Sequence, residues 1–272
     1  MSSLSGNKKV GLALGSGGWR GLAHIGVIKV LEQNNIPISF IAGSSAGALI
    51  GGLYSYFGNI AEIEKILENI GYIDLLRILG DPTAHLGFIK GERFLSFLNE
   101  FIYNVKIEDL KIPFVACTTN ILTGETVYLD KGNLATAIRA SISIPLIFTP
   151  VNIDGKKLVD GGNSVPVPTE KVREMGADVV IGVNLYGNIF PLTAALDGEM
   201  KLNTSEVFRL SVQMLLNQMA KENLKHADIA LNPKIPEKSF NIFKNFVKEK
   251  GTVMVGEEAM NEQMGKLKTL LT

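Results

Sequence analysis

Short apolar runs alternate along the chain with longer segments whose apolar residues recur at helical spacing. Val10–Leu14 is an apolar run of strand length, and Ala23–Glu32 after it has a helical period. The same order returns in Ile38–Ala42 followed by Ala48–Phe57. Further strands are predicted at Pro113–Thr119, Thr126–Leu129, Val151–Ile153, Lys157–Val159, Ala177–Leu185 and Ala227–Leu231. Strands that alternate with helices predict an α/β fold, a three-layer sandwich with a mostly parallel central sheet.

Two stretches interrupt this alternation. Residues 60–103 are mostly helical in period, with breaks at Gly80-Asp81-Pro82 and at Gly87, and we expect them to form a helical cap over one end of the sheet. Residues 187–202 mix apolar and charged positions without a period, which predicts a loop. No linker divides the chain, so residues 1–272 are expected to form one domain.

Composition narrows the class of protein. Lys and Arg number 27 and Asp and Glu number 27, so the formal charge is zero and no basic field indicates a nucleic-acid partner. The 46% hydrophobic and 20% charged shares are those of a globular protein, which excludes a disordered or fibrous chain. The single cysteine, Cys117, excludes an intrachain disulfide and suits a reducing compartment. Within its predicted strand we interpret Cys117 as a small buried residue.

The apolar runs are too short for a membrane span or a leader. None approaches the ~20 residues that a spanning helix needs. Val10–Leu14, which follows Lys8 and Lys9, is too short for the apolar part of a signal peptide. We therefore expect a cytoplasmic protein, with peripheral contact at a membrane left open.

The turn after the first predicted strand is rich in glycine. It reads Gly15-Ser16-Gly17-Gly18-Trp19-Arg20-Gly21 and leads into a helix, so its free N–H groups can hold an anion. A dinucleotide-binding fingerprint needs a glycine where Arg20 stands and an acidic residue after Ile41, which is followed by Ala42-Gly43. A nucleotide-phosphate loop needs Gly-Lys-Ser/Thr, which is missing here. An oxyanion site and a plain tight turn both stay open.

The turn after the second predicted strand matches G-x-S-x-G. It reads Gly43-Ser44-Ser45-Ala46-Gly47 and again leads into a helix. The two glycines allow Ser45 to sit on a sharp turn with its hydroxyl exposed, and the helix N-terminus favours negative charge beside it. Ser44 is a rival nucleophile only if the glycine spacing is ignored. A turn of small residues without chemistry is the alternative.

A serine nucleophile needs a base, and the chain offers two kinds. The three histidines are His24, His85 and His226; only His226 comes late enough for the usual Ser–acid–His order, and no motif surrounds it. Asp160 follows an apolar strand and precedes two glycines, Gly161 and Gly162, which permit close approach. A carboxylate is a weak base for a hydroxyl unless burial raises its pKa. On spacing alone, Asp160 is either a base or part of a turn.

Taken together, these motifs resemble the patatin-like phospholipase family, and specifically its compact bacterial members. The glycine-rich turn Gly15–Gly21, the elbow Gly43–Gly47 and the block Asp160–Gly162 occur in the family's order. The run Ala140–Pro150 is similar to the family's segment between the elbow and the aspartate. The resemblance spans Val10–Leu185. The chain departs from it at Ser16, where many relatives have the first of three successive glycines.

The resemblance implies a Ser–Asp dyad and an acyl-enzyme. Ser45 would attack the ester and Asp160 would accept the hydroxyl proton, with no cofactor and no metal. The backbone N–H groups of the glycine-rich turn would form the oxyanion hole. Two glycines would allow the sharp turn at the elbow, and three further residues would support the turns or contact the substrate. The oxyanion residues are Ser16, Gly17 and Gly18, the elbow glycines are Gly43 and Gly47, and the supporting residues are Arg20, Gly161 and Gly162.

The implied substrate is a lipid or other acyl ester, which needs an apolar groove. The cap segment offers apolar residues for it, or these belong to the ordinary core: Ile66, Ile70, Leu75, Leu76, Leu79, Phe88, Phe94, Phe97 and Leu98. Residues 238–250 alternate aromatic and lysine positions, typical of a helix at a membrane surface or of one packed on the domain. A non-catalytic lipid-binding or regulatory protein with the same fold is the alternative function, and dinucleotide binding is a distant third.

Overall fold

The structure is a computed structural model that describes residues 8–69, 80, 89–190, 203–235 and 250–272. Its centre is an eight-stranded sheet in the order β5-β6-β3-β2-β1-β7-β8, with β4 paired to β3. The pairs from β3 through β2, β1 and β7 to β8 are parallel, and β4, β6 and β5 add antiparallel pairs at one side. The strands are β1 (Val10–Leu14), β2 (Ile38–Ser44), β3 (Phe114–Asn120), β4 (Thr126–Leu129), β5 (Val151–Ile153), β6 (Lys156–Asp160), β7 (Val179–Val183) and β8 (Ile229–Leu231).

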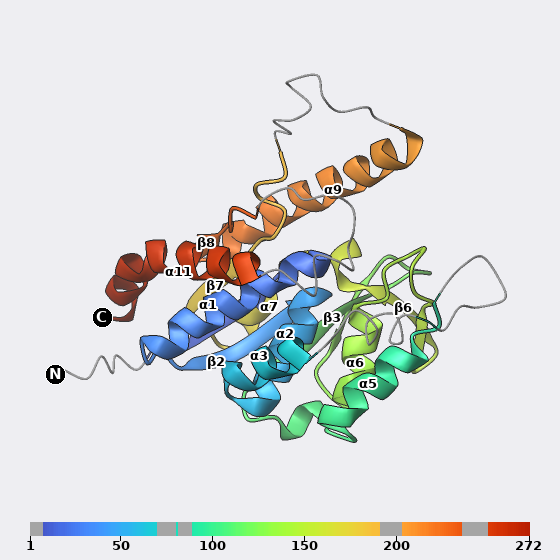
Figure 1. Cartoon of the computed structure of the whole chain (residues 1–272), viewed down its shortest axis with the longest axis horizontal. Coiled ribbons are helices and arrows are strands. Elements are labelled where there is room, and N and C mark those ends of the chain that lie inside the picture. The colour runs from blue at the N-terminus through green and yellow to red at the C-terminus, as the bar shows by residue number, and fades with distance from the viewer. Residues whose placement is uncertain (1–7, 70–79, 81–88, 191–202, 236–249) are drawn as a thin grey trace.

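Helices lie on both faces of this sheet (Figure 1). The larger helices are α1 (Leu22–Gln33), α2 (Ala46–Phe57), α3 (Ile60–Asn69), α5 (Glu92–Ile102), α6 (Leu134–Ser141), α7 (Thr169–Glu174), α9 (Thr204–Asn223) and α11 (Lys250–Leu271). Short 3-10 turns in the described ranges are η1 (Gly18–Gly21), η2 (Ile107–Asp109), η3 (Gly161–Asn163) and η4 (Leu224–His226). Helices on both sides of a mostly parallel sheet confirm the expected α/β sandwich.

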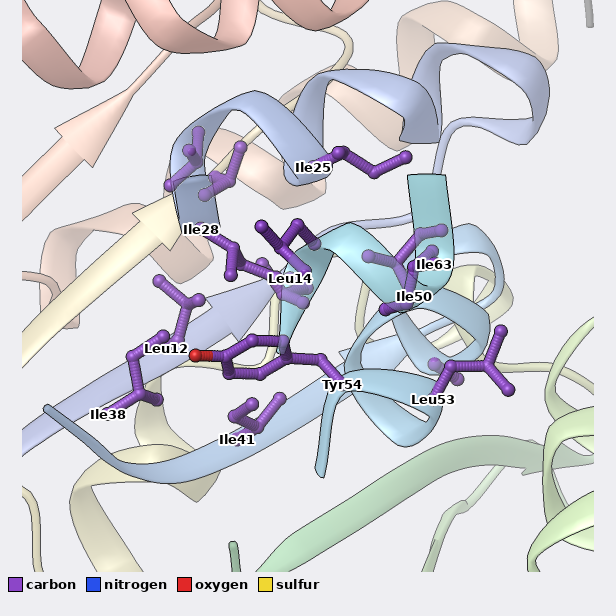
Figure 2. Packing of buried hydrophobic residues seen from close by; sticks show 14 of the residues in the cluster. Leu12, Leu14, Ile25, Ile28, Ile38, Ile41, Ile50, Leu53, Tyr54 and Ile63 are labelled. Atoms are coloured by element: carbon purple, nitrogen blue, oxygen red, sulfur yellow. The ribbon is translucent and has the colours of Figure 1, made fainter. Parts of the chain in front are cut away.

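The two faces of the sheet carry separate cores because neighbouring strand residues point in opposite directions. Leu12 and Leu14 of β1 pack with α1 and α2, where Ile25, Ile28 and Tyr54 complete the larger cluster (Figure 2). The residue between them, Ala13, faces the other side and belongs to a smaller cluster that includes Val172 of α7 and Val180 of β7. Since both faces are covered, all five residues of β1 are buried.

Tight turns behave as their sequences predict. Asp154 and Gly155 between β5 and β6 both have positive φ, 50° and 75°, the conformation of a two-residue hairpin turn. β2 continues to Ser44, two residues beyond the expected end, because Gly43 and Ser44 still pair with Ala116 and Cys117 of β3. β7 is shorter than the predicted run 177–185: its ladder with β1 begins at Val179, which pairs with Val10, and ends at Val183.

Only the ends of the expected cap segment are described, and both ends pack on the core. Leu98 of α5 is fully buried and Phe94 rests edge-on against Phe148 at 6.4 Å between ring centroids. Leu98 is therefore a core residue, whereas Ile66, Phe94 and Phe97 are half-buried. The other expected groove residues, Ile70, Leu75, Leu76, Leu79 and Phe88, lie outside the described residues, as does the lysine-rich stretch up to residue 249 and most of the expected loop after residue 190. The cap as a unit stays a prediction.

Cys117 lies in the middle of β3 and is fully buried, as expected. Burial raises the pKa of its thiol to about 12, outweighing the Ser44 hydrogen bond that lowers it. The thiol is therefore uncharged at neutral pH. Among the described residues, no helix is both long enough and apolar enough to cross a bilayer.

Candidate active site

Ser45 stands alone between β2, which ends at Ser44, and α2, which begins at Ala46. Its φ and ψ are 54° and −117°, a strained combination for a residue with a side chain. The glycines on either side are required by close backbone contacts. A Cβ on Gly43 would lie 2.3 Å from the Gly47 carbonyl oxygen, and one on Gly47 would lie 2.0 Å from that of Leu14. The turn therefore has the geometry of a nucleophile elbow.

Ser141 holds the backbone of Ser45 in this turn. The Ser45 N–H donates to Ser141 Oγ at 2.9 Å, and the Ser141 hydroxyl donates to the Cys117 carbonyl at 2.6 Å. Ser141 ends α6 and is fully buried, so these bonds are shielded from water. Sequence reasoning gave Ser141 no role of its own, although it lies in the run Ala140–Pro150 that carried part of the resemblance.

The Ser45 hydroxyl donates to the Asp160 carboxylate, with 2.5 Å between Oγ and Oδ2. Asp160 ends β6, and its other oxygen, Oδ1, accepts the N–H of Gly162 at 2.8 Å. The Asp160 backbone is also held, because its N–H donates to the Ser143 carbonyl and its carbonyl accepts the Thr119 hydroxyl, both at 3.0 Å. The two expected residues thus meet within hydrogen-bond reach although 115 positions separate them.

Burial tunes the carboxylate toward proton acceptance. Ser45 is 3% exposed and Asp160 is 5% exposed, so the pair is largely removed from water. This desolvation raises the pKa of Asp160 from 3.8 to about 6, while the hydrogen bonds from Ser45 and Gly162 oppose the rise. At neutral pH Asp160 is ionised and more basic than an exposed aspartate.

The glycines after Asp160 are needed for packing. A Cβ on Gly161 would lie 2.2 Å from the Cys117 carbonyl oxygen. A Cβ on Gly162 would lie 2.7 Å from Ser16 Oγ and 3.0 Å from Asp160 Oδ1. The Asp160–Gly162 block therefore brings β6 against β3 and against the glycine-rich turn at once.

The glycine-rich turn presents fewer donors than expected. The Ser16 N–H donates to the Pro166 carbonyl at 2.9 Å, so the expectation that Ser16 supplies an oxyanion donor is wrong. In the described part of the chain, no backbone carbonyl accepts the N–H of Gly17 or Gly18, and Gly18 has a φ of 59° that favours glycine. Two candidate donors therefore remain, both at the start of η1.

The Ser16 side chain has a different partner. Its Oγ lies 3.1 Å from the hydroxyl of Tyr186, which is also buried. Burial raises the pKa of Tyr186 to about 12, so the phenol keeps its proton and can donate to Ser16. This pair gives the Ser16 side chain a buried partner, and Tyr186 is a site neighbour that no local motif indicated.

The histidines do not serve the dyad in the described part of the chain. His24 is fully buried in α1, with Nε2 2.8 Å from the Gly15 carbonyl oxygen, and burial lowers its pKa to about 4. The ring is neutral at pH 7, and Nε2 carries the proton because it faces a carbonyl. His226 is exposed in η4, and His85 lies outside the described residues. His24 thus holds the glycine-rich turn, a role that sequence reasoning missed.

Arg20 remains within the turn it follows. The Arg20 guanidinium lies over the Trp19 ring at 5.4 Å from the centroid, and the backbone N–H of Arg20 donates to the Gly17 carbonyl at 3.3 Å. These contacts favour loop support, while contact with a lipid phosphate stays a prediction. Among the described residues, no three His, Cys, Asp or Glu side chains gather as metal ligands would.

The arrangement can therefore deprotonate a serine and offer backbone N–H groups to a developing anion. Comparison with known proteins concerns the family to which the chain belongs. The family model for patatin-like phospholipase matches residues 12–172. An NTE family protein of Mycobacterium tuberculosis is 39% identical over 184 residues, 68% of this chain and 51% of that protein. Lysophospholipase nte1 of Emericella nidulans is 33% identical over 183 residues, 65% of this chain and 12% of that protein.

The chain thus spans about half the length of the mycobacterial relative and a smaller share of the fungal one. Among solved structures, human GIVD cytosolic phospholipase A2 is similar with a TM-score of 0.53 at 11% identity, over 98% of this chain and 59% of that one. That likeness shows the fold. Since the family model covers more than half of the chain, the protein belongs to the patatin-like phospholipase family.

Proposed function

We propose that this protein is a serine acyl hydrolase that cleaves carboxylic esters of lipids through the dyad of Ser45 and Asp160. The observation that carries the proposal is the buried 2.5 Å hydrogen bond from Ser45 Oγ to Asp160 Oδ2. A serine hydroxyl is a nucleophile when a base accepts its proton, and Asp160 is the group in place to do so.

In the first step, Ser45 Oγ attacks the ester carbonyl carbon while its proton passes to Asp160 Oδ2. The pKa of about 6 narrows the gap between the aspartate and the hydroxyl, which favours this transfer. The N–H of Gly162 keeps Oδ1 in place, so Oδ2 stays directed at Ser45. General base catalysis of this kind contributes about 100- to 10,000-fold in rate.

The carbonyl oxygen becomes negatively charged and needs fixed donors. The N–H groups of Gly17 and Gly18 supply them, and the N-terminus of α2 adds a favourable dipole beside Ser45. Each donor in such a hole is worth about 100- to 1,000-fold in kcat. His24 and the Ser16–Tyr186 pair hold the turn that carries these donors.

Collapse of the tetrahedral intermediate breaks the ester bond. The leaving alcohol takes the proton from Asp160, and the acyl group stays on Ser45 Oγ. A water molecule then gives its proton to Asp160 and attacks the acyl carbon. Ser45 leaves with that proton, which restores the starting state and releases a fatty acid. Asp160 acts as base and acid in turn, so a histidine is not needed.

The family and the names of its relatives support a lipid substrate. The fungal relatives are called lysophospholipases, which makes a single-chain phospholipid the first natural substrate to test. The single cysteine suits a reducing compartment, and we accordingly propose that the reaction takes place in the cytoplasm. We also propose that residues 1–272 form one domain.

The test is hydrolysis of short and long p-nitrophenyl esters and of lysophosphatidylcholine by the wild type and three variants. Ser45→Ala and Asp160→Asn should lose at least 100-fold in kcat, whereas His226→Ala, at an exposed position, should keep its rate. A fluorophosphonate should label the wild type and spare Ser45→Ala. An inactive His226→Ala protein that is folded would overturn the dyad, and a wild type without activity or label would favour a lipid-binding role.

A further inference from the structure

Helix α9 exposes an apolar stripe between Val207 and Leu215. The stripe consists of large apolar side chains that are between 38% and 66% exposed: Val207, Phe208, Val212, Met214 and Leu215. At 100° per residue these positions occupy an arc of about 160° on the helix. The buried residues Leu210, Asn217 and Ala220 fall largely on the opposite side, where the helix meets the domain. The apolar arc is thus turned away from the core.

The stripe lies at the edge of the sheet that carries the dyad. β7 ends at this edge, since Tyr186 just beyond it contacts Ser16, and α9 returns from there to the start of the parallel strand β8. A 20-residue helix is about 30 Å long, whereas a five-residue strand spans about 16 Å. The N-terminal part of α9 therefore extends past the end of β7, and Figure 1 shows the orange helix rising away from the rest of the molecule toward that end.

Other exposed apolar residues share this edge. Leu122 is 72% exposed in the turn that follows β3, which runs parallel to β2. Leu146 is 67% exposed three residues after Ser143, whose carbonyl binds the Asp160 N–H. Leu122 follows β3, and Leu146 follows α6, whose last residue, Ser141, accepts the Ser45 N–H. Exposed apolar side chains from three separate segments therefore surround the same end of the molecule.

The area and the charge of the stripe indicate what it contacts. Five side chains that are each about half exposed present on the order of 450 Å² of apolar surface, so an interface between two copies would have to draw the rest of its roughly 800 Å² per partner from polar neighbours. Between Val207 and Leu215 no Asp, Glu, Lys or Arg falls inside the arc, since Arg209 lies outside it; Glu222 lies on the same side but about two turns further along. A small surface without charge fits the apolar layer of a lipid interface, which needs no matching partner residues.

We propose that the α9 stripe docks on a lipid surface and places the dyad at that surface. This inference rests on the proposed function, because a lipid hydrolase must meet substrate that is held in an aggregate. Insertion of uncharged side chains gives binding that depends little on salt. Docking through the lysine-rich stretch 238–250 would instead weaken steeply as salt screens the charges.

The experiment measures sedimentation with vesicles of phosphatidylcholine containing one fifth phosphatidylglycerol. All proteins carry Ser45→Ala, so the vesicles stay intact. Adding Phe208→Glu and Leu215→Glu together should reduce the partition coefficient at least tenfold, because each side chain removes apolar area and adds a charge. The matched control is Tyr103→Glu, which changes a residue that is 81% exposed after α5, near the start of α6 and away from Ser141. The control should bind within twofold of its parent.

A second readout separates folding from docking. In the Ser45 background, the double variant should hydrolyse the water-soluble ester p-nitrophenyl butyrate within twofold of wild type. Equal vesicle binding by the double variant and its parent would overturn the inference, as would a tenfold loss caused by 0.5 M salt. A dimer in ultracentrifugation that the double variant dissociates, without loss of vesicle binding, would assign the stripe to a second copy. Failure of the wild type on every ester would refute the proposed function but leave the vesicle result to stand by itself.

Discussion

Replacing Asp160 by asparagine removes a buried charge while keeping the shape of the side chain. The amide oxygen can still accept the Gly162 N–H, and the amide nitrogen can donate to Ser45 Oγ in place of the present bond. The variant should lose its base and therefore its activity. It should also be more stable than the wild type at pH 8, because ionised Asp160 is held away from water at a free-energy cost.

The size of this gain follows from the pKa of Asp160. Its value is about 6 in the folded protein against an ordinary 3.8, which corresponds to about 3 kcal/mol. Because the folded value is the higher one, this part of the stability is fully present below pH 3.8 and is lost as the pH rises through 6. Asparagine resembles the protonated acid at every pH. The difference between the two proteins should therefore grow from near zero at pH 4 to about 3 kcal/mol at pH 8.

Urea unfolding at pH 4, 5, 6, 7 and 8 measures this difference directly. His24, whose pKa is lowered to about 4, is common to both proteins, so its own pH dependence cancels. A variant less stable than wild type at pH 8, or a difference that does not change with pH, would refute the reasoning. Asp160→Glu is a useful companion, since it keeps the charge but lengthens the side chain and should not stabilise the fold.

Other consequences of the geometry can be tested with single changes. In the wild type kcat/KM should rise with pH through about 6 and then level off, because Asp160 must be ionised; a flat profile from pH 4.5 to 8 would contradict this. His24→Leu leaves the Gly15 carbonyl without its donor and should lower kcat at least tenfold with little change in KM. His24→Gln can restore this hydrogen bond and with it the rate. Equal rates for both variants would show that the hydrogen bond does not affect catalysis. Gly47→Ala puts a Cβ 2.0 Å from the Leu14 carbonyl oxygen of β1 and should lower the free energy of unfolding by at least about 3 kcal/mol. Gly124→Ala adds a Cβ that meets nothing within 4 Å and should lower it by only about 1 kcal/mol. Thermal melts of both proteins check this ranking.

Local pattern was sufficient for the elements that carry the dyad. β1 and β2 are apolar runs because both of their faces are covered, and the turns after them are glycine-rich because the backbone comes within contact distance there. The positions of Ser45 and Asp160 at the ends of β2 and β6 follow from the same runs. The spacing of the glycines in these motifs therefore reflects the short backbone distances found in the structure.

Contacts between distant segments could not be predicted in the same way. Ser141 and Ser45 are 96 positions apart, and Tyr186 and Ser16 are 170 positions apart. No local sequence pattern therefore indicates either hydrogen bond. The engagement of the Ser16 N–H by Pro166 is likewise a tertiary event, which is why a donor was expected where none is available. Leu98 was a candidate for a groove because an apolar helix face looks the same whether it lines a cavity or the core.

Cys117 makes the protein suitable for site-specific labelling. It is the single cysteine of the chain, it is fully buried, and its pKa of about 12 leaves almost no thiolate at pH 7.5 to react with a maleimide. A cysteine introduced at an exposed position such as Tyr103 would therefore carry a fluorophore or spin label without prior removal of the native thiol. The distance from such a probe to a vesicle could then be followed in a protein whose core is otherwise unaltered.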